Sequence, residues 1–202
     1  MLIFAHTGIT LGSAVLLNGT LEKSRAYRYR IGVVHNRNQQ SSGTASWFSS
    51  LSEYVDIRLL LIGSMLPDII DKPIGQLFFI NTFHSGRIFG HTLIFCILMI
   101  AGGIYLYWSR KRTWMLAIPY GTITHLILDM MWLEPKTLLW PLYGFSFEKL
   151  DLTYWIDNML SALFSNPLVG IPELVGLVIV SWFLWHLIRR GKVFAFIRKG
   201  QI

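Results

Sequence analysis

Residues 91–108 read HTLIFCILMIAGGIYLYW and contain no Lys, Arg, Asp or Glu. A run of this length approaches the ~20 apolar residues that a helix needs to cross the hydrocarbon core of a bilayer. Two further runs have the same character: WMLAIPYGTITHLILDMMWL at 114–133 and LVGIPELVGLVIVSWFLWHLI at 168–188. Each of these two holds a single carboxylate, Asp129 and Glu173 respectively. The three runs predict an all-α protein built from membrane-crossing helices.

The composition agrees with this class. Of the 202 residues, 53% are hydrophobic and only 14% are charged, whereas a soluble domain carries about 25% charged residues. The mean hydropathy of +0.48 also excludes a disordered chain. The single cysteine, Cys96, rules out an intramolecular disulfide framework and a cysteine-based zinc finger. We therefore expect one membrane-embedded helical domain over residues 1–202.

Two weaker segments bring the expected number of crossings to about five. Residues 1–19 are almost wholly apolar and lack a basic leading segment, so they predict a retained first helix rather than a signal peptide. Residues 57–70 form a shorter run in which Pro67 is expected to break or kink the helix just before Asp68. The intervening stretch 20–56 predicts a polar loop. The aromatic-rich stretch 134–167 predicts a loop at the membrane boundary.

Charge predicts the orientation of the chain. Thirteen of the 18 basic residues lie in three clusters, at 23–37, 110–112 and 189–199. The positive-inside rule places all three in the cytoplasm, which puts the N-terminus outside and the basic tail 189–202 inside. We expect a multi-pass protein of the cytoplasmic (inner) membrane whose basic clusters contact lipid headgroups. Nucleic-acid binding, which a pI of 9.7 also allows, is the less favoured reading. No protein partner is indicated.

With this topology, most of the polar groups in and near the helices fall at one depth, near the outer surface. Ionisable residues inside membrane segments are costly and usually functional. A lone membrane histidine is often only hydrogen-bonded to a neighbouring helix, but a set at one depth would be hard to tolerate unpaired. The set predicts a shared metal site and comprises His6, Asp68, Asp71, His84, Arg87, His91, His125 and Asp129.

Spacing strengthens two parts of this set. His125 and Asp129 are four residues apart, so both lie on one helix face, where they would share one ion or Asp129 would orient the His125 ring. Asp68 and Asp71 are three apart, and after a break at Pro67 they would occupy a first helical turn. Imidazole and carboxylate ligands suit zinc, our first choice for the divalent metal, and also manganese or iron.

The residues that carry these groups resemble a known family. AHTGITLG at 5–12, GSMLPDIID at 63–71, GRIFGHT at 86–92 and THLILD at 124–129 are similar to motifs of the LexA-binding, inner-membrane-associated hydrolases, a membrane-bound, metal-dependent family. That family is in turn similar in motif order to zinc-dependent phospholipases C, which hydrolyse phosphoesters. The polar loop 20–56 and the tail after 189 lie outside the resemblance.

The resemblance implies a set of metal ligands, and Asp71 as a ligand or a residue behind the ligands. The chain also departs from the family pattern. Gly86 stands where the family has its first histidine and Gly90 where it has threonine, and His84 would have to supply the missing ligand. The implied ligands are His6, Asp68, His91, His125 and Asp129.

The predicted function is hydrolysis of a phosphoester or lipid-like substrate by metal-activated water at the outer face of the membrane. Asp68 or Asp71 would accept the proton of the water, and Arg87 would pair with a substrate phosphate or carboxylate. Membrane lipids and a small-molecule or lipid substrate are the expected partners. Two alternatives stay open: a metal-free lipid phosphatase with a histidine nucleophile at His125, to which SGRIFGH at 85–91 is faintly similar, and a non-catalytic protein with a structural metal site or an ion pathway.

Overall fold

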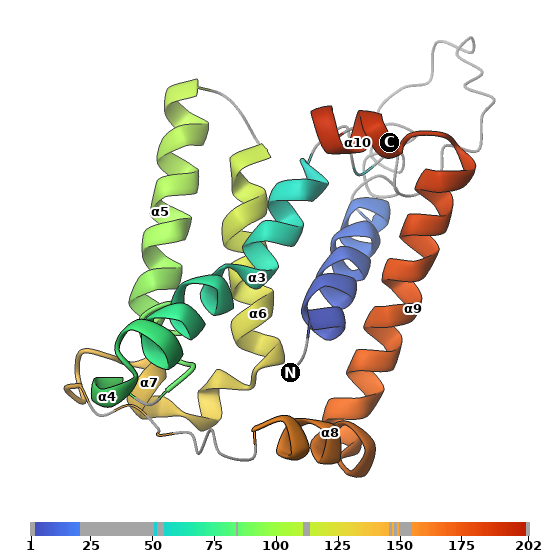
Figure 1. Cartoon of the computed structure of the whole chain (residues 1–202). Helices are drawn as coiled ribbons and strands as arrows, with labels where there is room; N and C mark the ends of the chain where they lie inside the picture. The colour runs from blue at the N-terminus through green and yellow to red at the C-terminus, as the bar shows by residue number, and fades with distance from the viewer. Residues whose placement is uncertain are drawn as a thin grey trace, which may run out of the picture.

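The computed structural model describes residues 3–20, 51, 55–83, 85–110, 114–145, 147, 149 and 155–200. Within these ranges the chain forms helices and no strands (Figure 1). Most of the predicted polar loop 20–56, and His84, lie outside the described residues. The predicted all-α class is confirmed for the part of the chain that the structure describes.

Two helices are long and apolar enough to cross a membrane. They are α5, Leu93–Arg110, and α9, Pro167–Arg189, and they stand on opposite sides of the bundle (Figure 1). Only 11% and 17% of their residues are buried within the protein. The core helix of a soluble protein would be mostly covered, so the exposed apolar surface of α5 and α9 suits contact with lipid. These helices match two of the three predicted crossings.

The third predicted crossing is interrupted. Within 114–133, α6 covers only Ala117–Leu128, flanked by the 3-10 turns η3, Trp114–Leu116, and η4, Met131–Leu133. Twelve helical residues span about 18 Å, against a hydrocarbon core of about 30 Å. Met130, with φ of 52° in the left-handed region, cannot continue the helix. The prediction of one uninterrupted helix here is therefore wrong.

The sequence predicts a break or a kink at Pro67, and the structure shows no break. Helix α3 runs without interruption over Ile57–Pro73 and leads into a π-helical turn, η2, Ile74–Phe78. Pro67 has no N–H to donate to the carbonyl of Gly63, four residues earlier. The hydroxyl of Thr122 on α6 lies 3.4 Å from that carbonyl, but it is closer, at 3.1 Å, to the carbonyl of Ile118 on its own helix. The Gly63 carbonyl therefore has a long contact across the helix pair in place of the lost bond, and α3 continues past Pro67.

Close backbone contacts between helices depend on glycine. A Cβ added at Gly121 of α6 would lie 2.5 Å from the backbone nitrogen of Ser64 and 2.6 Å from the carbonyl carbon of Gly63 on α3. A Cβ at Gly8, on the helix formed by residues 3–20, would likewise overlap the backbone of Gly176 on α9. Small residues allow such approach in membrane bundles. The crossings hold α3 on α6 and the first helix on α9.

The Gly121 contact can be tested by a matched pair of substitutions. We expect Gly121→Ala to destabilise the protein by about 1–3 kcal/mol, because the new methyl group overlaps backbone atoms that cannot move independently. Gly102→Ala is the control, because an added Cβ there meets nothing within 4 Å. Thermal unfolding in detergent measures both. Equal melting temperatures for the two variants would contradict the crossing.

The shorter helices gather at the two ends of the bundle. In Figure 1, α4, Ile80–Phe83, α7, Pro135–Leu138, and α8, Trp155–Ser165, lie at the end that holds the N-terminus, while α10, Val193–Lys199, lies at the opposite end. Helix α8 was not expected, since it falls within the predicted loop 134–167.

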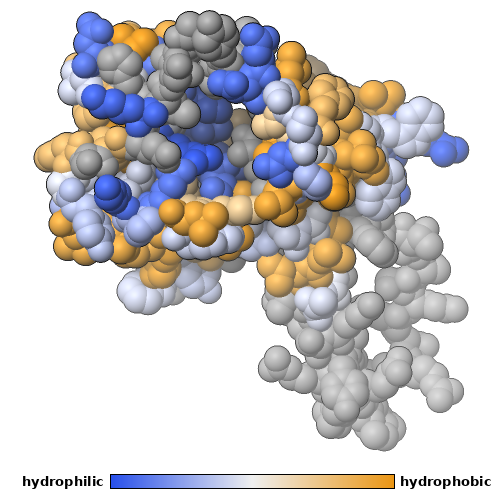
Figure 2. Space-filling view, turned by 90° about the horizontal axis from the view of Figure 1, so that it is seen from below, coloured by the Kyte–Doolittle hydropathy of each residue, from blue (hydrophilic) through white to orange (hydrophobic). Residues whose placement is uncertain are grey.

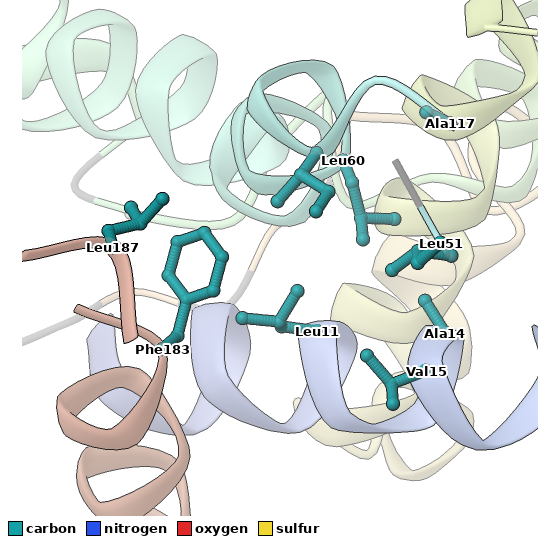
Figure 3. Packing of buried hydrophobic residues seen from close by; sticks show 9 residues of the cluster. Leu11, Ala14, Val15, Leu51, Leu60, Ala117, Phe183 and Leu187 are labelled. Carbon is teal, nitrogen blue, oxygen red and sulfur yellow. The ribbon is translucent and has the colours of Figure 1, made fainter. Parts of the chain in front are cut away.

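An apolar cluster closes the α10 end of the bundle (Figure 3). It joins the first helix, the starts of α3 and α6, and the end of α9. Its buried members are Leu11, Ala14, Val15, Leu51, Ile57, Leu60, Ala117, Phe183 and Leu187.

Candidate metal centre

Five of the predicted polar residues converge at the end of the bundle away from the apolar cluster. His6 comes from the first helix, Asp68 from α3, His91 from the segment just before α5, and His125 and Asp129 from the end of α6. The three histidines are fully buried, and only 5% of the Asp129 side chain is exposed. Figure 2 shows that hydrophilic residues gather in a hollow on this face of the molecule, with hydrophobic residues around it.

Four donor atoms from three segments face one point. The Nε2 atoms of His91 and His125 are 3.1 Å apart. Asp68 Oδ1 lies 3.6 Å from His91 Nε2 and 3.9 Å from His125 Nε2. On the other side, Asp129 Oδ2 lies 3.7 Å and 4.0 Å from the same two nitrogens. These distances are comparable to those between ligands around one ion, about 3.3 Å for a tetrahedral zinc site with bonds of about 2.0 Å.

The hydrogen bonds of the rings assign a lone pair to each of these nitrogens. His91 Nδ1 donates to Asp71 Oδ2 at 2.8 Å, and His125 Nδ1 donates to the carbonyl of Ser64 at 2.6 Å. In the neutral rings, Nε2 is then an acceptor in both. Two acceptor nitrogens and two carboxylate oxygens at these distances would repel one another unless positive charge lay among them, either a proton on one of the rings or a metal ion. The donor set therefore fits a divalent metal ion.

His6 adds a fifth donor group. It belongs to a π-helical turn, η1, Ala5–Ile9, a local widening that is frequent at functional sites. Its ring stacks on that of His125 with centroids 4.0 Å apart, and its Nε2 lies 3.2 Å from Asp129 Oδ1. Within the described part of the chain, neither ring nitrogen of His6 has a hydrogen-bond partner of good geometry, although both are buried. A buried imidazole without a hydrogen bond also fits a metal ligand. The described residues contain two overlapping groups of three side chains whose ligand atoms all lie within 4.8 Å of one another: His6–Asp68–His125 and His91–His125–Asp129.

Asp71 lies behind the ligands. Its fully buried carboxylate accepts from the backbone N–H of Ile88 at 2.7 Å and of Gly90 at 2.8 Å. It also accepts from the backbone N–H and the Nδ1 of His91. With both oxygens occupied, Asp71 holds the segment 88–91 on α3 and fixes the His91 ring, as carboxylates behind metal-binding histidines do. This geometry does not suit Asp71 as the proton acceptor that was predicted.

Close packing explains why glycine stands at position 90, where the family pattern has threonine. A Cβ there would lie 2.9 Å from both the Cα and the carbonyl oxygen of Pro67, and 3.2 Å from Asp71 Oδ1. Threonine at this position would push the segment away from α3. Gly90 thus permits the close approach on which the Asp71 hydrogen bonds depend.

Arg87 is bonded within the protein. Its Nε and Nη2 lie 3.1 Å and 3.0 Å from Asp129 Oδ2, and its Nη1 bonds Glu134. Burial by itself would lower the pKa of Arg87, but the two carboxylates outweigh this effect and raise the pKa above its ordinary value. Arg87 therefore orients Asp129, and its predicted role of pairing with a substrate phosphate does not suit this arrangement.

Two charged neighbours of the centre were missed by sequence reasoning. Lys72 binds Asp68 Oδ2 at 2.7 Å, and the spacing of four residues on one helix was a signal that could have found it. Glu134, the partner of Arg87, follows the left-handed turn at Met130, and no local sequence pattern predicts that turn.

Fold and centre together define a helical membrane protein with a buried histidine–aspartate cluster that could hold a metal ion. The family model of the YdjM inner membrane protein matches residues 1–195. The chain therefore belongs to the YdjM inner membrane protein family. Comparison with curated proteins and with solved structures found no match.

Proposed function

We propose that this protein is a membrane-bound, metal-dependent hydrolase that cleaves a phosphoester at the outer face of the inner membrane. The observation that carries the proposal is the meeting of the His91 and His125 lone pairs with two carboxylates inside a buried cluster. The residues that would hold the ion are His6, Asp68, His91, His125 and Asp129. A bound divalent ion supplies a Lewis acid and a water acidified toward a pKa of about 7.

The chain's own groups supply the remaining chemistry. Asp68 turns Oδ1 toward the centre while Lys72 holds Oδ2. Where His6, His91, His125 and Asp129 hold the ion, Oδ1 of Asp68 is left to accept the proton of the attacking water. The water oxygen would form a bond to phosphorus as the bond from phosphorus to the leaving alcohol breaks. The alcohol would then take up the proton. Asp71 and Arg87 keep His91 and Asp129 in place during this step.

The proposed topology puts the centre on the outer side. The ends of α5 and α9 that carry Arg110 and Arg189 both lie at the end of the bundle opposite the N-terminus, on its two sides (Figure 1). Under the positive-inside rule that end is cytoplasmic. We propose five membrane segments: the first helix, α3, α5, α6 and α9. The short α6 is compatible with this arrangement because interrupted helices are tolerated where other helices cover them.

Two alternatives fit the geometry less well. In a metal-free phosphatase the aspartate would orient the histidine nucleophile, but His125 Nδ1 donates to Ser64 and Asp129 lies 4.0 Å from the opposite ring nitrogen. An ion pathway would need polar groups through to the cytoplasm. Hydroxyls do continue above the centre, with Thr10 bonded to Thr124 at 2.8 Å, but the apolar cluster of Figure 3 lies beyond them.

The test uses purified protein in vesicles with p-nitrophenyl phosphate and bis(p-nitrophenyl) phosphate as soluble probes. We expect chelation to abolish hydrolysis, readdition of zinc, manganese or iron to restore it, and Asp68→Asn to lower it about 10²–10⁴-fold. The matched control is Asp157→Asn, an exposed position on α8.

Full activity in the presence of chelator would contradict the proposal, and phosphohistidine at His125 would favour the metal-free phosphatase. Metal-loaded protein that hydrolyses neither probe would favour a structural metal site.

A further inference from the structure

An apolar groove of about 770 Å³ lies beside the metal centre. Its volume falls within the range of about 300–1,000 Å³ that is usual for ligand pockets. Its apolar walls come from the first helix, α8 and α9, and include Phe4, Leu163, Ile171, Leu174 and Leu177. Of the described residues that line it, two are charged, Lys72 and Glu173.

The two charged residues connect the groove with the centre. Lys72 Nζ lies 2.7 Å from Asp68 Oδ2, and the other oxygen of Asp68 faces the metal ligands. Glu173 accepts from the backbone N–H of Phe4 at 3.1 Å, two residues before His6. A molecule in the groove would therefore reach the centre past Lys72.

Glu173 also indicates that the groove receives a ligand. The residue is 95% buried, and its Oε1 has no hydrogen-bond partner among the residues that the structure describes. A buried carboxyl oxygen without a partner is costly, and the cost would be relieved by a donor on a bound molecule. A hydroxyl or amine group at the polar end of the ligand would supply this donor.

The exposed wall of the groove belongs to a candidate membrane span. Ile171 and Leu174 are each 62% exposed on α9, and Phe164 on α8 is 84% exposed. If α9 crosses the bilayer, these side chains contact acyl chains, and the groove is continuous with the lipid phase. The Lys72 ammonium spends one of its three N–H donors on Asp68, and its side chain is 43% exposed, so donors remain at the inner end of the groove for an anionic headgroup.

We propose that this groove binds one acyl chain of an anionic membrane lipid, with the lipid phosphate at Lys72 and a hydroxyl or amine donor at Glu173. Lipid binding is a property of the groove itself, whereas the role of this lipid as the substrate rests on the proposed function. The lipid would enter sideways from the bilayer. Its phosphoester would then lie next to the metal ligands while the lipid stays in the membrane.

The experiment uses the full-length protein in vesicles that contain a phosphatidic acid with a diazirine in one acyl chain. After photolysis, we expect mass spectrometry to find cross-links concentrated on the groove residues of α8 and α9. Leu174→Trp should fill the groove and lower these cross-links about tenfold, a loss of ~1.4 kcal/mol in binding. Leu184→Trp is the matched control, because Leu184 is also exposed on α9 but does not line the groove.

Lys72→Gln should remove the preference for this lipid over a phosphatidylcholine that carries the same label.

The outcomes separate the two proposals. Cross-links that are spread evenly over α5 and α9, or that are unchanged in Leu174→Trp, would overturn the proposal that the groove binds lipid, even if soluble phosphoesters are hydrolysed. Groove-specific cross-links in a protein that hydrolyses nothing would support the lipid site and overturn only the hydrolase. Metal content is measured in each variant, because an unchanged metal content shows that the fold is intact.

Discussion

Replacing His125 by alanine is expected to remove the divalent ion from the purified protein. The Nε2 atom of His125 lies within 4.0 Å of donor atoms on His91, Asp68 and Asp129, so its ring takes part in both candidate ligand groups. Loss of a residue behind the ligands costs about 10–100-fold in metal affinity, and loss of a ligand should cost more. Elemental mass spectrometry of detergent-purified protein measures the metal per chain.

The control for this substitution is His186→Ala, which removes a histidine near the other end of the bundle on α9. It should retain the metal content of the wild type. Asp68→Ala should lose the metal together with His125→Ala, since the two residues share one candidate group. Wild-type protein that binds no zinc, manganese or iron after their addition would refute the metal centre.

Replacing Asp71 by alanine is expected to destabilise the fold by more than about 3 kcal/mol. Its carboxylate is the acceptor for three backbone N–H groups and for the His91 ring, all of them buried. Each buried donor left without an acceptor costs about 1–3 kcal/mol. Thermal unfolding in detergent, with wild type alongside, measures the loss.

Asp71→Asn separates the two roles of this residue. The amide keeps one acceptor oxygen and most of the volume, so the fold should be less affected than in Asp71→Ala. Metal affinity should still fall about 10–100-fold, because the His91 ring loses its carboxylate partner. The surface control is Asp157→Ala on α8. Wild-type stability and metal affinity in both Asp71 variants would show that the segment 88–91 is held in another way.

Several features of this protein follow from local sequence alone. Apolar runs of sufficient length predicted the helices α5 and α9, because the bilayer imposes a minimum length on a crossing helix. The residues of the polar cluster were also predicted from the sequence. Charged groups in an apolar surrounding need partners at the same depth of the membrane. The structure brings together five of the predicted ligands, while His84 lies outside the described residues.

Other features depended on residues far apart in the chain. The helix α3 continues through Pro67, and the Gly63 carbonyl that the proline leaves without its helical N–H lies 3.4 Å from the hydroxyl of Thr122, 59 positions away. Arg87 bonds Asp129, 42 positions away, and Glu134, 47 positions away. Asp71 became a support for His91 because the segment 88–91 folds back onto α3 at Gly90.

The sequence by itself thus determined the helical membrane class and the residues that meet at the centre, because both follow from the cost of placing polar groups in an apolar medium. Only the tertiary structure decided which of those residues face the common point, which ones hold them there, and that an apolar groove adjoins them at Lys72. These choices depend on which carbonyls, carboxylates and helix faces come within hydrogen-bonding distance. That proximity is a property of the packed helices and not of any one segment.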